Sequence, residues 1–268
     1  MLRVTALLGL YILLSSHELF LKTDSYFLPT NSPSELFLFN GTFDISENTI
    51  SRDRIVEAKI VGPDFDFIPA ENDYYDRQNK TYLRFKSGEK GTYVAGISTY
   101  PKMIELDAEA FKAYLEHEGL NHILKTRQEE GISNLSAKEK YSKHVKTIFQ
   151  VSGSKSGHFN TKFGYPIEFI PLMNPYELEV GNSMRFRLLV QGKPLGNQVV
   201  HFSSRDVGME AEAAEKSTKT DENGEFEITL DMAGKWYVAT IHIFKSNEPN
   251  IDYESQWATL TFEISKDQ

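Results

Sequence analysis

The sequence predicts a mainly β protein, built from two β-sandwich domains with a helical segment between them. Short segments rich in β-branched and aromatic residues occur in both halves of the chain, and the middle changes to helical spacing. The 268 residues are enough for about two domains. The 40% content of hydrophobic residues is enough to build packed cores, so we do not expect global disorder.

The first sixteen residues, 1–16, predict a secretory signal peptide. Arg3 precedes the apolar run Val4–Leu14, and two small serines stand before His17. The run is shorter than the roughly 20 apolar residues that a membrane-spanning helix needs. We therefore expect a periplasmic or secreted protein that is cleaved before His17 and whose mature chain has no membrane span.

Residues 17–105 predict the N-terminal β-sandwich. Glu35–Phe43 and Arg54–Pro63 are short β-rich segments that contain or end in Gly or Pro. Thr81–Thr99 contains two strands around a glycine-rich turn. No helical pattern separates these strands, which is typical of an antiparallel sandwich.

Residues 106–151 predict a helical segment that packs on the N-terminal domain. Asp107 is a candidate N-cap, and apolar residues follow it at steps of three and four. A second helix is expected where Ser136 and Glu139 match a capping box. In that helix His144 would lie on the inner face.

Residues 152–164 predict a linker, because they are small, polar and rich in glycine. Strands return in residues 165–268. Met184–Ser204 reads as strand, turn and strand, Thr218–Phe244 repeats this scheme, and Trp257–Ile264 closes the domain. About seven strands in roughly 100 residues predict an immunoglobulin-like sandwich.

Composition and motifs exclude several classes of site. The chain contains no cysteine, so a metal site must use His, Asp, Glu, backbone groups or the α-amino group. The net charge of −9 disfavours binding to nucleic acid, whose phosphates it would repel. The sequence has no P-loop, no G-x-S-x-G and no H-E-x-x-H motif, so we do not expect an enzyme.

Several blocks resemble one known bacterial family. These blocks are "HELFLKTDSYFL", "FKAYLEHEGLNHILKTR", "EKYSKHVKTIFQV", "NPYELEVGNSMRFRLLVQGKPLGNQVV" and "TKTDENGEFEITLDMAGKWYVATIHI". Together they resemble a periplasmic family of domains of unknown function that is described as NikM-like, after components of nickel uptake. The resemblance implies a periplasmic protein with a role in nickel or cobalt uptake, and an envelope membrane transporter as a candidate partner.

The candidate ligands are histidines and one carboxylate. If His17 is the mature N-terminus, its α-amine and its imidazole can chelate one divalent transition metal ion, nickel or cobalt first. His242 or His144 would complete the site. Glu18 or Asp24 would add an oxygen or orient an imidazole. For each histidine the alternative is a packed or surface side chain without metal.

The remaining histidines carry weaker expectations. His117 and His122 are five residues apart, which does not place them on one helix face, so both are interpreted as surface or boundary residues. His158 lies in the predicted linker. His201 could face either side of its strand.

Two other classes of function stay open. One is a non-catalytic cell-envelope module that binds protein or glycan, which scattered histidines would favour. The other is an oxidative enzyme with copper held by an N-terminal histidine brace, which requires a second histidine close to the amine.

Overall fold

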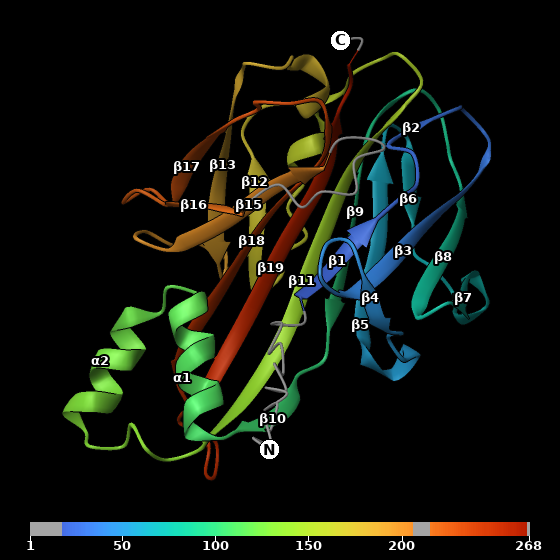
Figure 1. Cartoon of the computed structure of the whole chain (residues 1–268). Coiled ribbons are helices and arrows are strands. Elements are labelled where there is room, and N and C mark those ends of the chain that lie inside the picture. Colours follow the sequence, from blue (N-terminus) through green and yellow to red (C-terminus); the bar gives the residue numbers. More distant parts are fainter. Residues whose placement is uncertain (1–17, 206–214, 267–268) are drawn as a thin grey trace, which may run out of the picture.

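The structure, a computed structural model, describes residues 18–205 and 215–266 (Figure 1). Across these residues the protein is mainly β, which confirms the predicted fold class, and its strands form three sheets. The described part also contains two α-helices, which follow one another between β10 and β11.

The sheets divide the strands as follows. The five-stranded sheet consists of β1 (Glu18–Lys22), β3 (Pro33–Gly41), β4 (Ser46–Asn48), β7 (Tyr74–Arg77) and β8 (Lys80–Lys86). The ten-stranded sheet consists of β2 (Phe27–Leu28), β5 (Ile55–Gly62), β6 (Phe65–Phe67), β9 (Gly91–Thr99), β10 (Lys102–Leu106), β11 (Ala137–Val151), β15 (Val199–Arg205), β16 (Lys216–Lys219), β18 (Gly234–Lys245) and β19 (Tyr253–Ile264). The four-stranded sheet consists of β12 (Ile167–Pro171), β13 (Ser183–Val190), β14 (Lys193–Pro194) and β17 (Glu225–Thr229). The α-helices are α1 (Ala108–His117) and α2 (Asn121–Glu129), and short 3₁₀ turns are η1 (Arg52–Arg54), η2 (Glu71–Asp73), η3 (Gly157–Asn160) and η4 (Pro175–Glu177).

The ten-stranded sheet is the middle layer and has a hydrophobic core on each face. On β11, Val145 and Phe149 pack into the core shared with the five-stranded sheet. Ile148 points the opposite way, into the core shared with the four-stranded sheet. The three layers are visible in Figure 1, where the long strands β11, β18 and β19 cross the centre.

The two helices cover one end of the middle layer, on the face against which β1 also packs. Phe111 and Leu115 of α1 are buried against Ile243 of β18 and Tyr253 of β19. Figure 1 shows α1 beside the lower ends of these strands. The ends of α1 and β1 are thereby brought to one face of the middle layer.

The helical prediction for residues 106–151 is half right. Asp107 caps α1 as expected, because its Oδ1 accepts a hydrogen bond of 2.8 Å from the Ala110 amide. The second predicted helix, from Ser136 onward, is wrong, since Ala137–Val151 forms the strand β11. Most of β11 is buried on both faces, so its apolar residues do not alternate with polar ones as they do in a half-exposed strand.

The predicted linker, residues 152–164, packs against the strands. Ser156 Oγ donates a hydrogen bond of 3.2 Å to the Thr92 carbonyl, and Asn174 Nδ2 donates one of 3.3 Å to the Ser156 carbonyl. Strands from before and after this segment belong to the same ten-stranded sheet. The two predicted sandwiches therefore share a layer, and the predicted domain boundaries stay a prediction.

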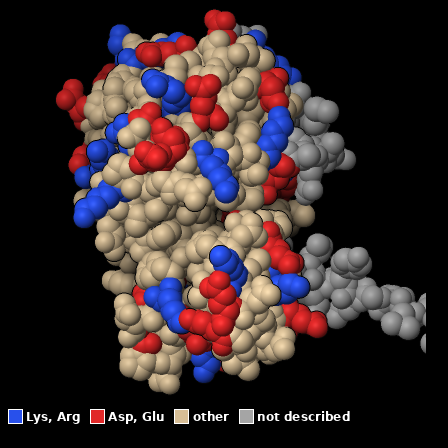
Figure 2. Space-filling view, turned by 90° about the vertical axis from the view of Figure 1, so that its left-hand side faces the viewer, with Lys and Arg blue, Asp and Glu red and all other residues tan. Residues whose placement is uncertain are grey.

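Charge is mixed on the surface that carries the helices and the four-stranded sheet. Figure 2 shows Lys and Arg side chains lying among Asp and Glu side chains there, with an uncharged band across the middle. Among the residues that the structure describes, no helix combines the length and the apolar character that a membrane crossing requires.

A buried ion pair fastens the segment after β11 to the middle layer. Lys146 Nζ lies 3.1 Å from Glu168 Oε2, and the two side chains are 1% and 2% exposed. The ammonium also donates to the Thr161 carbonyl at 2.9 Å. The carboxylate accepts from the amides of Phe163 at 3.1 Å and Gly164 at 3.0 Å. Each charge is thus hydrogen-bonded on several sides, which is what a buried pair needs.

We expect Lys146→Met to lower the free energy of unfolding by about 3–5 kcal/mol, because it leaves the Glu168 carboxylate buried without its partner charge. Urea unfolding monitored by circular dichroism measures this loss. Lys112→Met is the matched control, since Lys112 of α1 makes an exposed pair with Glu116 and should change stability by less than about 0.5 kcal/mol. Equal losses in the two variants would contradict the expectation.

Candidate functional site

The four predicted metal ligands lie in different places. His17 lies outside the described residues, directly before β1. Glu18 begins β1 and is half-buried. His144 lies on β11 and His242 lies on β18, both in the ten-stranded sheet.

His144 is held by two serines and points away from Glu18. Its Nδ1 is 2.9 Å from Ser98 Oγ, and its Nε2 is 3.0 Å from Ser142 Oγ. Successive residues of a strand point to opposite faces, so His144 faces away from the side chain of Lys143. Lys143 is the residue of β11 that interacts electrostatically with Glu18. The structure therefore does not bring His144 to Glu18.

His242 also lies on the other face of the sheet. It shares a face of β18 with Val238, which packs in the core of the four-stranded sheet. Tyr237 points the opposite way, and its ring lies 5.1 Å from that of Phe20 on β1. The His242 ring packs near Phe244, with centroids 5.6 Å apart, and burial lowers its pKa. Glu18 and His242 are thus separated by the sheet.

A different set of side chains gathers near Glu18. His201 of β15 lies opposite Ala239 of β18, so it shares a face with Tyr237. His201 Nδ1 is 3.2 Å from Glu215 Oε1, and the Tyr237 hydroxyl donates a hydrogen bond of 2.7 Å to Glu215 Oε2. Tyr237 thereby fixes the carboxylate that faces the imidazole.

The end of α1 adds another imidazole and another carboxylate. His117 Nδ1 is 3.1 Å from Glu118 Oε1, and Glu118 Oε2 is 3.8 Å from His201 Nε2. The rings of His117 and His201 stack with centroids 6.2 Å apart. Gly119 follows in a left-handed conformation (φ +67°), and a Cβ there would lie 3.2 Å from Val199 Cγ2. A glycine at this turn thus lets the end of α1 approach β15 closely.

Glu18, His117, Glu118, His201 and Glu215 together form what we call the His–Glu cluster. Burial lowers the pKa of His201, but the hydrogen bond to Glu215 and the charge of Glu118 outweigh it and raise that pKa above its usual value. The hydrogen bond to Glu118 raises the pKa of His117. Both imidazoles are thus favoured in the charged form, as expected beside carboxylates.

This arrangement disfavours the ionised form of Glu18. Burial, and then the charges of Glu118 and Glu215, raise the pKa of Glu18 well above its usual value, while Lys143 lowers it. Carboxylates that lie close together resist ionisation unless a cation stands between them. The arrangement therefore favours the protonated form of Glu18.

The donor types fit a divalent transition metal. Imidazole nitrogens and carboxylate oxygens are ligands for nickel, cobalt, copper and zinc. His201 Nε2 is buried and has no hydrogen-bond partner. In residues 18–205 and 215–266 no three His, Asp or Glu side chains already stand in coordinating positions. The carboxylates instead face the imidazoles, so binding would require these side chains to rearrange.

Sequence reasoning did not assign His117 and His201 to the site. Their separation in the chain is too long for a local pattern to show that they meet. The available local signal is Gly119, which follows His117 and Glu118. A glycine at this position indicates the end of a helix, so the last side chains of that helix lie beside the element that packs against its end. That the strand is β15 follows from the sheet order and not from local spacing.

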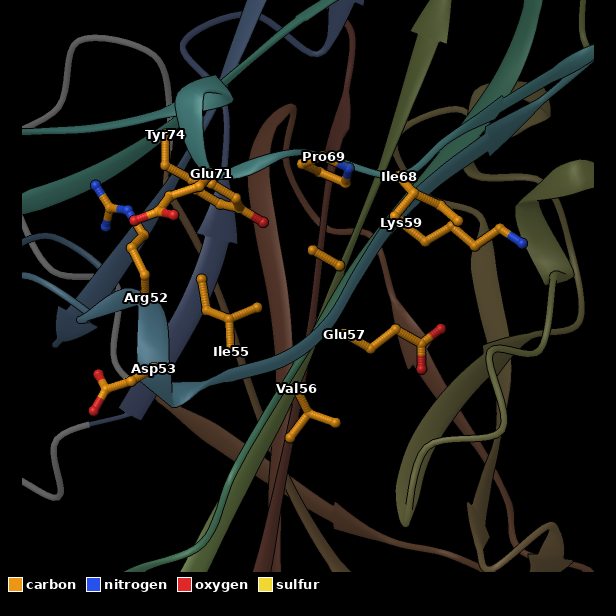
Figure 3. Close-up of a pocket in the computed structure, with 11 residues that line it drawn as sticks. Arg52, Asp53, Ile55, Val56, Glu57, Lys59, Ile68, Pro69, Glu71 and Tyr74 are labelled. Atoms are coloured by element: carbon orange, nitrogen blue, oxygen red, sulfur yellow. The ribbon is translucent and has the colours of Figure 1, made fainter.

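A pocket elsewhere has different chemistry. It lies along β5 and is lined in part by Arg52, Glu57, Lys59, Ile68 and Tyr74 (Figure 3). None of the described residues that line it is a histidine. Its lining mixes acidic, basic and apolar groups, so it offers no donor set comparable to the His–Glu cluster.

The fold and the cluster thus define a mainly β protein with a semi-buried acidic and imidazole site. The chain belongs to the family of the domain of unknown function DUF4198, whose model matches residues 14–243. No curated protein matches the chain.

Three solved structures share low similarity with the chain. The D0-D1 domain of intimin is 12% identical with a TM-score of 0.21, covering 92% of this chain and 98% of that one. A titin fragment is 10% identical with a TM-score of 0.19, covering 92% and 96%. A Salmonella alpha-2-macroglobulin mutant is 10% identical with a TM-score of 0.24, covering 91% of this chain and 14% of that chain.

His144 makes the stability of the protein depend on pH. Burial lowers its pKa from 6.5 to about 4, so the unfolded chain binds a proton in this interval that the folded protein does not. Its contribution to stability is present above pH 6.5 and is lost as the pH falls toward 4. At about 1.4 kcal/mol per pKa unit, the loss amounts to about 3 kcal/mol at pH 4.

We therefore expect the stability of the wild-type protein to fall more steeply than that of His144→Gln between pH 6.5 and pH 4. Urea unfolding at a series of pH values measures both profiles. His122→Gln, on the exposed side of α2, is the control and should follow the wild-type profile. Parallel profiles for the wild type and His144→Gln would rule out this role of His144.

Proposed function

We propose that the protein binds a divalent transition metal ion, nickel or cobalt first, at the His–Glu cluster, as a periplasmic accessory of metal uptake. One observation carries the proposal: the buried Nε2 of His201 has no hydrogen-bond partner and faces Glu118 Oε2 at 3.8 Å. A metal ion bound there would satisfy this nitrogen and neutralise the carboxylates around it. The metal is the cargo of the protein and not a group that performs chemistry.

The raised pKa of Glu18 supports the same site. Glu118 and Glu215 disfavour the ionised form of Glu18, and a divalent cation reverses that effect by adding positive charge between the carboxylates. His201 Nδ1 stays with Glu215, which would hold the ring in place while Nε2 binds the metal. This is the usual arrangement of a metal-bound histidine whose second nitrogen has a carboxylate partner.

His17 is the proposed further ligand. It directly precedes Glu18 in the chain, and cleavage before it would create an α-amine on the same residue as the imidazole. The membership in a family of unknown function is compatible with this role, and the resemblance to nickel-uptake components motivates the choice of metal. His144 and His242 have no part in the proposed site.

Titration calorimetry of the mature chain with Ni²⁺, Co²⁺, Cu²⁺ and Zn²⁺ tests the site. We expect one equivalent to bind, and His201→Ala to weaken the affinity at least about tenfold, because it removes a ligand. His242→Ala is the matched control and should bind like the wild type. No binding by the wild type, or equal binding by His201→Ala, would contradict the proposal and favour a cell-envelope module without metal.

The N-terminal chelate is tested separately. We expect a chain with one glycine added before His17 to bind the metal at least about tenfold more weakly than the chain that begins at His17, because the α-amine is displaced from the imidazole. Intact mass of the exported protein establishes where it begins. Equal affinity of the two chains would remove His17 from the site while leaving the proposal for His201 intact.

A further inference from the structure

A polar pocket lies on the same face as the His–Glu cluster, next to Lys143. Its volume is about 430 Å³, which is within the range of small-molecule sites. Its wall combines residues of η1, β1, β3, β4, β9, β10 and β11. The lining residues that matter here are Asn40, Ser51, Arg54, Lys102, Tyr141 and Lys143.

The charges in this lining have one sign. Arg54, Lys102 and Lys143 are basic, and the other described residues of the lining carry no carboxylate. Neither Arg54 nor Lys102 makes an ion pair with a carboxylate in the described part of the chain. The lining thus gathers three basic residues in a protein whose net charge is −9.

Arg54 has a buried donor without an acceptor. Its Nη1 is shielded from solvent and has no hydrogen-bond partner. The guanidinium lies 5.6 Å from the centre of the Tyr141 ring, so the ring packs beside it without accepting its hydrogen bonds. A buried donor of a charged group that lacks an acceptor is costly, and most such groups in proteins have one.

Lys143 is the most deeply placed of the three cations. It is 6% exposed, and its Nζ is 3.5 Å from Asn40 Oδ1 and 5.1 Å from the centre of the Trp257 ring. Burial, with the charges of Arg54 and Lys102, lowers its pKa to about 7, although Glu18 and Glu139 raise it. Together with Arg54 and Lys102, Lys143 makes the wall of the pocket basic.

We propose that this pocket binds a small oxyanion, a carboxylate or a phosphate, with Arg54 as its main contact and Lys102 and Lys143 supplying further positive charge. The planar guanidinium matches two oxygens of either group in parallel hydrogen bonds. Asn40 and Tyr141 place neutral polar groups beside the same space. The inference does not rest on the proposed metal site, because none of the residues that line the pocket belongs to the His–Glu cluster.

The experiment is titration calorimetry at pH 6.5 and low ionic strength on metal-free protein, with inorganic phosphate in one arm and succinate in the other. We expect at least one of the two to bind in the millimolar range or tighter. Binding of phosphate alone, of succinate alone or of both supports the site and shows which kind of oxyanion it accepts. No heat from either anion up to 10 mM, an order-of-magnitude limit for useful affinity, would overturn the proposal.

Variants locate the binding. We expect Arg54→Met to weaken anion binding at least about tenfold, because a charge-assisted pair of hydrogen bonds is lost. Arg52→Met is the matched control in the same 3₁₀ turn, since the Arg52 guanidinium already pairs with Asp76 at 3.1 Å. Lys102→Met, on the exposed strand β10, should weaken binding by a smaller factor and keeps the test valid if Arg54→Met fails to fold.

The outcomes separate this site from the metal site. His201→Ala should bind the anion as the wild type does. Unchanged binding in both Arg54→Met and Lys102→Met would place the anion elsewhere and overturn the proposal. Loss of anion binding in His201→Ala would also overturn it, because it would show that the two sites are one.

Discussion

The parallel pairing of β11 with β19 is the constraint on which the rest of the molecule depends. It runs from Glu139 opposite Tyr253 to Thr147 opposite Thr261. Parallel neighbours cannot be joined by a tight turn, so the chain must leave the sheet and return. Here the returning connection contains all strands of the four-stranded sheet, which packs on one face while β1 and its partners pack on the other. One pairing thus joins the two cores through a common layer.

The same layer explains the distribution of charge around the candidate site. Its face toward β1 carries Lys143 from β11, which lines the basic pocket, and His201 from β15, which belongs to the His–Glu cluster. Glu18 interacts with residues of both regions, since Lys143 of the pocket lowers its pKa while Glu118 and Glu215 of the cluster raise it. The start of β1 therefore lies within electrostatic range of both the basic pocket and the His–Glu cluster.

The features that sequence predicted correctly are local ones. The fold class and the cap at Asp107 follow from spacing within a few residues. The helix expected after Ser136 failed because β11 is buried on both faces, and a strand of that kind has no alternating pattern to distinguish it from a buried helix. The His–Glu cluster could not be predicted without the sheet order. Only the pairing of β15 with β18 places His201 on the face against which the end of α1 packs.

The shared layer also limits how the protein can move. Two sandwiches connected by a flexible linker can close around a ligand by bending at a hinge, as many binding proteins do. In this protein, closing would shear the continuous ladder of backbone hydrogen bonds that runs through β9, β11, β19 and β18. The ladder consequently resists bending between the two cores, and a ligand at the face between β1 and α1 would be accommodated by side-chain rotations.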